Sequence, residues 1–299
     1  MLVRSMQGHE LLKAALPYCI PIAILGIAIR VTWRDMRLAL AEWRGILLAC
    51  AVCFVLDPLI AAAVCKGLQP NRFVEGAVLF AAIAPGDPFV VLEAEHRKGN
   101  VPLSIVFSCL LALLMPLSLF VWMPIMVHWF GGPADRVSAA GAFFDLVKLV
   151  FPFVVGGVAL RSLVPKFAEA IEGPVKILAQ VAYIFIGGLV VFVGIKFILT
   201  YSLMTALAVF IVASLSLIAG YRISAFSTER SRRTGALAVA LGNFVVVIYI
   251  GTEAYKLPSQ EFCAALAVAV VVRILAIFFW NRVARRSAAR AEAEPVPAA

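Results

Sequence analysis

Apolar runs of about 20 residues repeat along the chain, and short connections between them carry most of the charges. A helix needs about 20 mostly apolar residues to cross a bilayer, so each run predicts one membrane-spanning helix. The pattern predicts about nine spans, near 11–31, 45–65, 73–96, 101–125, 143–163, 174–197, 202–221, 234–255 and 260–281. We therefore expect an all-α polytopic membrane protein with one transmembrane domain over residues 1–285.

Composition and charge agree with a protein that lives in a lipid bilayer. Of 299 residues, 63% are hydrophobic and 14% are charged, whereas a soluble domain is about half apolar and about a quarter charged. Seventeen of the 26 Lys and Arg residues fall in one set of alternate connections and seven in the other. The positive-inside rule then predicts a cell (inner) membrane protein with its N-terminus outside and its C-terminus in the cytoplasm.

The net charge of +9 is explained by these loops, so we expect no nucleic-acid partner. Residues 286–299 are polar and rich in Ala and Pro, and we expect them to form a disordered cytoplasmic tail.

Two of the predicted spans are interrupted. The span at 73–96 contains Pro85, Gly86, Asp87 and Pro88, and the span at 234–255 contains Gly242 and Asn243. Proline removes a backbone donor, and a freed backbone group at membrane depth survives only beside protein or a water-filled cavity. An acid at this depth costs roughly 2.5–3.5 kcal/mol on insertion scales and tends to be functional. The two breaks therefore predict a ligand cavity.

The two interrupted spans occupy matching places if the fifth span is left unpaired. Spans one to four then correspond to spans six to nine, with the opposite orientation in the membrane. A matched pair of interrupted segments in inverted halves indicates the midplane binding site of a transporter. We therefore expect an inverted repeat with two interrupted helices that cross.

The residues around these breaks resemble the bile acid:sodium symporter family. The stretch "PGDPFVVLEAEHRKGNVPLSIVFSCLLALLMPL" fits the family's first broken helix, and "RRTGALAVALGNFVVVIYIG" resembles the second. Matching positions are Pro85, Gly86, Gly99, Asn100, Leu103, Ser104 and Asn243. The likeness spans roughly residues 10–285. It implies a core domain at about 45–125 and 202–281, a panel at about 11–31 and 143–197, and alternating access for a small organic anion bound between them.

The sodium sites of that family are largely replaced here. The resemblance puts Val90 and Val91 where the family has Ser and Asn, Cys53 where it has Gln, and Ala238 and Gly242 where it has Glu and Gln. Only Ser104 and Ser108 keep oxygen ligands in the matching helix. We expect proton coupling ahead of uncoupled transport, with sodium coupling third, and no other cofactor or bound metal.

Acids stand inside the predicted spans instead. Asp57, Asp87 and Glu93 lie in or near helix breaks, and a desolvated carboxyl holds its proton tightly enough to couple transport to protons. Asp57 has an alternative role as the partner of a buried base, Arg273 or Lys148, and Arg273 has its own alternative role in binding an anionic substrate. Glu95 and His96 are expected to be solvated near the cytoplasmic surface.

Other functions stay open beside a transporter. One is a non-transporting receptor or sensor on the same scaffold, and another is an auxin-efflux or arsenite-type carrier, although the arsenite version expects a Cys beside the first break. An enzyme is not expected, because the spans hold no nucleophile–base pair, metal-ligand cluster or phosphate loop. The candidate binding residues are Asp57, Pro85, Gly86, Asp87, Glu93, Ser104, Ser108, Gly242 and Asn243.

Overall fold

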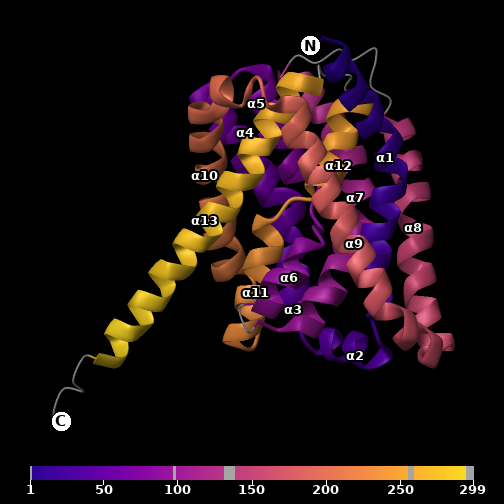
Figure 1. Cartoon of the computed structure of the whole chain (residues 1–299). Helices are drawn as coiled ribbons and strands as arrows, with labels where there is room; N and C mark the ends of the chain where they lie inside the picture. The colour runs from indigo at the N-terminus through magenta and orange to yellow at the C-terminus, as the bar shows by residue number, and fades with distance from the viewer. Residues whose placement is uncertain (1, 97–98, 131–138, 255–258, 294–299) are drawn as a thin grey trace.

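Long apolar helices run side by side through the structure, a computed structural model that describes residues 2–96, 99–130, 139–254 and 259–293 (Figure 1). All regular secondary structure in these ranges is helical. The first half contains α1 (Leu2–Ala28), α2 (Trp33–Ala41), α3 (Trp43–Ala51), the π-helix η1 (Val52–Leu56), α4 (Asp57–Leu68), α5 (Arg72–Ile83), α6 (Phe89–His96) and α7 (Val101–Phe130). The second half contains α8 (Ala139–Leu163), α9 (Pro165–Gly194), α10 (Ile198–Ile223), α11 (Glu229–Ala240), α12 (Phe244–Tyr249), the π-helix η3 (Ile250–Ala254) and α13 (Ser259–Ala293).

Seven helical stretches within the described ranges are long and apolar enough to cross a bilayer. They are Glu10–Ala28, Trp43–Leu68, Val101–Met126, Ala140–Leu163, Pro165–Gly194, Leu203–Ile223 and Gln260–Trp280. Each coincides with one of the nine predicted spans. The other two predicted spans are divided into shorter helices, α5 with α6 and α11 with α12 and η3. The chain is a multi-pass membrane protein.

The helices pack in two neighbourhoods, and each combines helices from different parts of the sequence. Helix α1 lies along α8 and α9, while α10 lies along α11 and α13. The two neighbourhoods meet where α13 packs on α9 and where α7 packs on α8. Leu163, Leu199 and Leu203 are more than three-quarters exposed on the outside, where lipid would cover them.

Pro58 explains the π-helix in the second span. A proline cannot donate to the carbonyl four residues earlier, and here that carbonyl belongs to Phe54. The chain widens into η1 just before Pro58, and the indole Nε1–H of Trp122 donates to the Phe54 oxygen at 2.7 Å. The carbonyl that proline leaves unpaired is therefore satisfied by a side chain from α7, as membrane depth requires.

The chain end differs from its expected disorder. Residues 286–293 continue α13, which extends away from the bundle (Figure 1). Alanine has the strongest helix propensity, and this segment is rich in it, so the helix continues past the last apolar turn. Residues 294–299 lie outside the described residues.

Candidate functional site

The two helix breaks meet. Pro85 and Gly242 form an isolated antiparallel bridge, and the Asn243 backbone N–H donates to the Ala84 carbonyl at 2.6 Å. The Asn243 side-chain amide also donates to the Gly86 carbonyl, at 3.3 Å. Backbone groups freed by one break are thus paired by the other, which is how non-helical backbone survives away from water. We call this meeting point, residues 84–88 and 241–243, the crossover.

Two glycines allow this close approach. A Cβ on Gly242 would lie 2.0 Å from the Ala81 carbonyl oxygen and 2.6 Å from Nη1 of Arg273. Gly86 has a φ of 92°, a left-handed conformation that side chains rarely adopt, and its Cβ would lie 2.8 Å from the Ala112 nitrogen. Both positions therefore require glycine for steric reasons before any ligand is considered.

Asp87 and Asn243 each begin a half-helix. The Asp87 carboxylate accepts a hydrogen bond at 2.7 Å from the N–H of Phe89, the first residue of α6. The Asn243 side chain accepts one from the Val246 N–H at 3.2 Å and caps α12. Each of the two side chains therefore satisfies a backbone donor in the first turn of a half-helix. The positive end of α6 is therefore already matched by the protein's own carboxylate.

Asp87 also connects the crossover to α9. Its side chain is only 3% exposed and accepts a hydrogen bond from the Tyr183 hydroxyl. The Tyr183 ring packs edge-on against Phe244 of α12, with ring centroids 4.4 Å apart. Sequence reasoning missed Tyr183, because a single tyrosine in an apolar helix is no signal by itself. Its spacing from Lys176 and Gln180 on one face of α9 was the available clue.

Asp57 lies deeper in the bundle, at the start of α4. It is 2% exposed and its carboxylate is hydrogen-bonded by the Ser216 hydroxyl of α10. Arg273 of α13 is also buried and interacts electrostatically with both Asp57 and Asp87. Lys148, the alternative partner for Asp57, is exposed on α8. Among the described residues, Nη1 of Arg273 has no hydrogen-bond partner, so this guanidinium serves the two acids by charge.

The remaining candidates lie on α6 and α7. Glu93 is buried on α6. The Ser104 hydroxyl donates to the Val101 carbonyl at 2.7 Å, within its own helix. Ser108 is fully buried, and its hydroxyl has no partner among the described residues. The structure brings Pro85, Gly86, Asp87, Gly242 and Asn243 together, joins Asp57 to them through Arg273, and shows no hydrogen bond from Ser104 or Ser108 to the crossover.

Three of the positions that the resemblance assigns to sodium ligands are apolar and lie in one hydrophobic cluster. Cys53, Val90 and Ala238 belong to one hydrophobic cluster with Leu103 and Phe107. Sodium requires several oxygen donors, and side chains of this kind offer none. This region is packed as core.

An apolar cavity of about 310 Å³ lies between α1, α6 and α9. Its polar lining consists of Arg30, Lys176, Gln180 and Tyr183. Tyr183 therefore faces the cavity and also holds Asp87. Pro88 and Phe89 line the same space, so the cavity adjoins the crossover.

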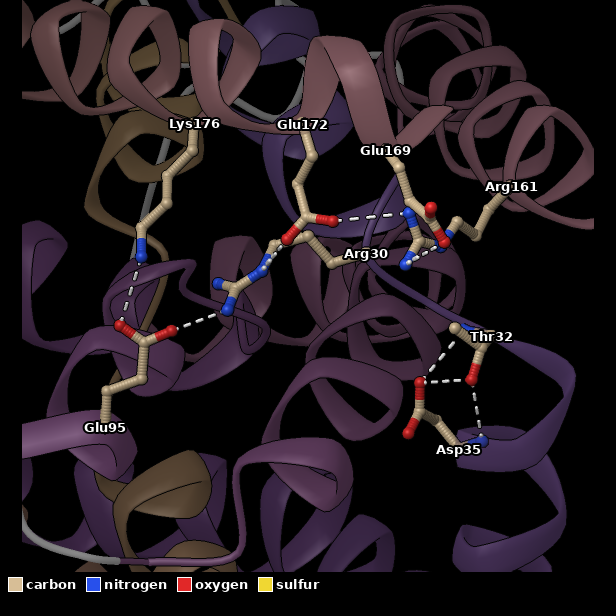
Figure 2. Close-up of polar contacts among 8 residues, drawn as sticks. All are labelled: Arg30, Thr32, Asp35, Glu95, Arg161, Glu169, Glu172 and Lys176. Carbon is tan, nitrogen blue, oxygen red and sulfur yellow. Dashed lines mark hydrogen bonds and ion pairs between the residues drawn. The ribbon is translucent and has the colours of Figure 1, made fainter. Parts of the chain in front are cut away.

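A group of ion pairs links the helices around this cavity (Figure 2). Glu95 Oε1 lies 2.6 Å from Arg30 Nη2, and Glu95 Oε2 lies 3.3 Å from Lys176 Nζ. On its other side, Arg30 Nε lies 3.5 Å from Glu172, which also pairs with Arg161 at 3.3 Å. The expectation that Glu95 is simply solvated was wrong, because its side chain is 27% exposed and joined to two cations. In the sequence, Arg30 and Lys176 indicated only the orientation of the spans in the membrane.

These features define a multi-pass membrane protein with paired broken helices, a buried acid at their crossover and an adjoining apolar cavity. A scan against protein-family models matches residues 17–201 to the sodium bile acid symporter family. The match covers more than half of the chain, and the chain belongs to this family of transporters. Helices α11 to α13, with the second break, lie beyond the matched residues. A search of curated proteins finds no match.

Proposed function

We propose that this protein is a secondary active transporter that moves a small amphipathic organic anion across the cell membrane by alternating access. The observation that carries the proposal is the position of Asp87. It caps a half-helix at the crossover and is held by Tyr183, a side chain that also lines the cavity. Tyr183 thus connects a titratable group to a ligand-sized cavity, and intramembrane acids beside broken helices are typical of ion and substrate pathways in transporters.

The proposed architecture has nine spans arranged as an inverted repeat. The seven uninterrupted spans are joined by two broken ones, α5 with α6 and α11 with α12 and η3. Helices α1, α8 and α9 would form the panel, and the helices of the crossover would belong to the core. The packing of α1 on α8 and α9, and of α10 on α11 and α13, supports this division. Rocking of one unit against the other would open the cavity to each side in turn.

The substrate class follows from the cavity. Most of its lining is apolar, and its two charged residues, Arg30 and Lys176, are both cations. Ligand sites are mostly apolar with a few placed polar groups that fix orientation, and their volumes begin near 300 Å³. A molecule with an apolar body and one anionic group matches this lining.

Proton coupling is the favoured energy source. Among the described residues, Asp57 and Asp87 are buried acids and Arg273 is the buried cation that acts on both, so these three groups carry one excess negative charge when both acids are ionised. Low dielectric penalises such a charge, and binding a proton removes it. The apolar cluster around Cys53, Val90 and Ala238 argues against sodium at the family's positions. Uncoupled transport ranks second.

The test is uptake of amphipathic carboxylates into proteoliposomes under an imposed proton gradient, a sodium gradient or neither. We expect the proton gradient to drive uptake by the natural protein and by Glu229→Gln, a control at a carboxylate that is 48% exposed and outside the cavity. Asp87→Asn should lose the response to the proton gradient. Sodium-driven uptake would contradict the proposed coupling, and ligand binding without any uptake would replace the transporter with a receptor.

A further inference from the structure

The ion pairs of Glu95 join α6 to the helices that would form the panel. Arg30 follows the end of α1, and Lys176 lies on α9. Each oxygen of the Glu95 carboxylate contacts a different cation, at 2.6 Å and 3.3 Å (Figure 2). The Glu95 carboxylate thus bridges one cation that follows α1 and another that lies on α9.

The same two cations are the charged residues of the cavity lining. Arg30 and Lys176 border the apolar space, and Glu95 does not. The carboxylate that satisfies them therefore approaches from outside the cavity. Inside the cavity, an anionic ligand would meet the same pair of cations with its apolar body against Ile27, Phe89 and Ile184.

The N-terminus of α6 is the half-helix end nearest the cavity, and it is a poorer site for the anionic group of a ligand than the two cations. The N-terminus of α6 would attract an anion, but the Asp87 carboxylate already accepts the hydrogen bond from the Phe89 N–H there. A second carboxylate beside Asp87 would meet like charge. Anionic ligands are thus directed to the other end of the cavity.

We propose that Arg30 and Lys176 bind the carboxylate or sulfonate of an amphipathic substrate, and that Glu95 is an internal competitor which holds these cations when the substrate is absent. Glu95 is a positioning residue, because it acts through the two cations. The inference rests on the proposed function for the identity of the ligand as a substrate. It adds the residues that recognise the anion and a latch between core and panel that binding releases.

Arg30 has a second anchor that keeps it in place when Glu95 leaves. Its Nε lies 3.5 Å from Glu172 of α9, and Arg161 of α8 pairs with Glu172 at 3.3 Å and with Glu169 at 3.7 Å. Glu172 and Lys176 are four residues apart on one face of α9. Both binding cations therefore stay with α9 while Glu95 moves with α6.

The test is equilibrium binding to the purified protein in phosphatidylcholine nanodiscs, which needs no transport. The probes are cholate, taurocholate and the neutral methyl ester of cholate. Glu95→Gln should lower the Kd of the two anions about tenfold, because their internal competitor is gone, and Lys176→Gln should raise it about tenfold. Both variants should leave the methyl ester within about twofold, and Glu229→Gln, at an exposed ion-paired carboxylate of α11 outside the cavity, should bind all three probes like the natural protein.

Several outcomes would overturn the inference. Equal or weaker anion binding in Glu95→Gln would make Glu95 purely structural, and equal shifts for the methyl ester would remove the role of charge. Loss of cholate binding when phosphatidylglycerol replaces part of the phosphatidylcholine would assign the cations to an anionic lipid. If Glu95→Gln does not fold, Glu95→Asp tests the same point: its shorter side chain cannot bridge both cations, so unchanged cholate affinity refutes the competitor.

The binding assay and the uptake assay test the anion site and the transporter proposal separately. Tightened binding in Glu95→Gln without uptake in any variant would refute the transporter and keep the anion site. Proton-driven uptake with unchanged binding in Glu95→Gln would keep the transporter and refute the site.

Discussion

The substitution Gly242→Ala tests whether the two broken helices cross. A Cβ at this position would lie 2.0 Å from the Ala81 oxygen and 2.9 Å from the Ala81 carbonyl carbon, where ordinary contact is 3.4–4 Å. Both atoms belong to the backbone of α5, so no rotamer change relieves the clash. The two segments must separate by more than 1 Å, since a contact at 2.0 Å has to reach at least 3.4 Å.

The cost follows from two contributions. Overpacking of a close contact costs about 1–3 kcal/mol. Separation also weakens the hydrogen bond from the Asn243 N–H to the Ala84 carbonyl, which is 2.6 Å long and contributes about 1 kcal/mol. We therefore expect Gly242→Ala to lower the free energy of unfolding by about 2–4 kcal/mol.

The assay is unfolding in mixed micelles by titration with SDS, followed by tryptophan fluorescence. Gly187→Ala is the matched control, because a Cβ there meets nothing within 4 Å and alanine favours the α9 helix by about 1 kcal/mol. Adding Ala81→Gly to Gly242→Ala should give no rescue, since the clash is with backbone. Wild-type stability in Gly242→Ala, or rescue by Ala81→Gly, would refute the crossover geometry.

Three further predictions concern side-chain hydrogen bonds. Trp122→Phe should cost about 1–3 kcal/mol of stability in the same titration, because the Phe54 carbonyl loses its donor, whereas Trp43→Phe at a half-exposed site should cost less than about 0.5 kcal/mol. Asn100→Ala removes the bond to Ser231 and the cap of α7 and should cost about 2 kcal/mol; a change under about 0.5 kcal/mol would show that these bonds are dispensable. Tyr183→Phe should fold normally and slow proton-driven uptake by roughly tenfold or more, because Asp87 loses its hydroxyl donor; unchanged uptake would exclude this contact from transport.

The interrupted spans were predictable from sequence because proline and glycine act locally. Pro85, Gly86 and Pro88 stand within four residues and together disfavour a continuous helix, and Asp87 marks the break as unusual at membrane depth. Proline alone does not break a span, because Pro17 and Pro21 lie inside continuous α1. The seven uninterrupted spans were predictable for a similar reason, since bilayer thickness alone sets their length. Their ends were less certain, and α9 begins at Pro165 where the span was expected at 174.

Long-range pairings were not predictable in the same way. Tyr183 and Asp87 are 96 residues apart, and Arg30 and Glu95 are 65 apart. Nothing in the local pattern around these residues selects the partner, because a charged residue near a membrane surface is satisfied equally by water. An inverted repeat predicts that the two breaks lie together, but it says nothing of α9, which supplies three of the cavity's four polar side chains.

Side chains of α9 contact α6 near both of its ends, and these two contacts link the two proposals. Tyr183 holds Asp87 at the start of α6, and Lys176 holds Glu95 near its end. Tyr183 and Lys176 are seven residues apart, roughly 10.5 Å along a helix, and Asp87 and Glu95 are eight apart, roughly 12 Å, so the two helices run in opposite directions with matched contacts.

Helix α9 cannot move away from α6 without breaking both contacts. Under the two proposals, a substrate anion that takes over Lys176 releases Glu95, and a proton on Asp87 removes the charge that strengthens its hydrogen bond from Tyr183. Each ligand would then free one end of α6, and neither alone would free the helix. Movement that requires both ligands at once is the condition for symport, because transport of either one alone would dissipate the gradient.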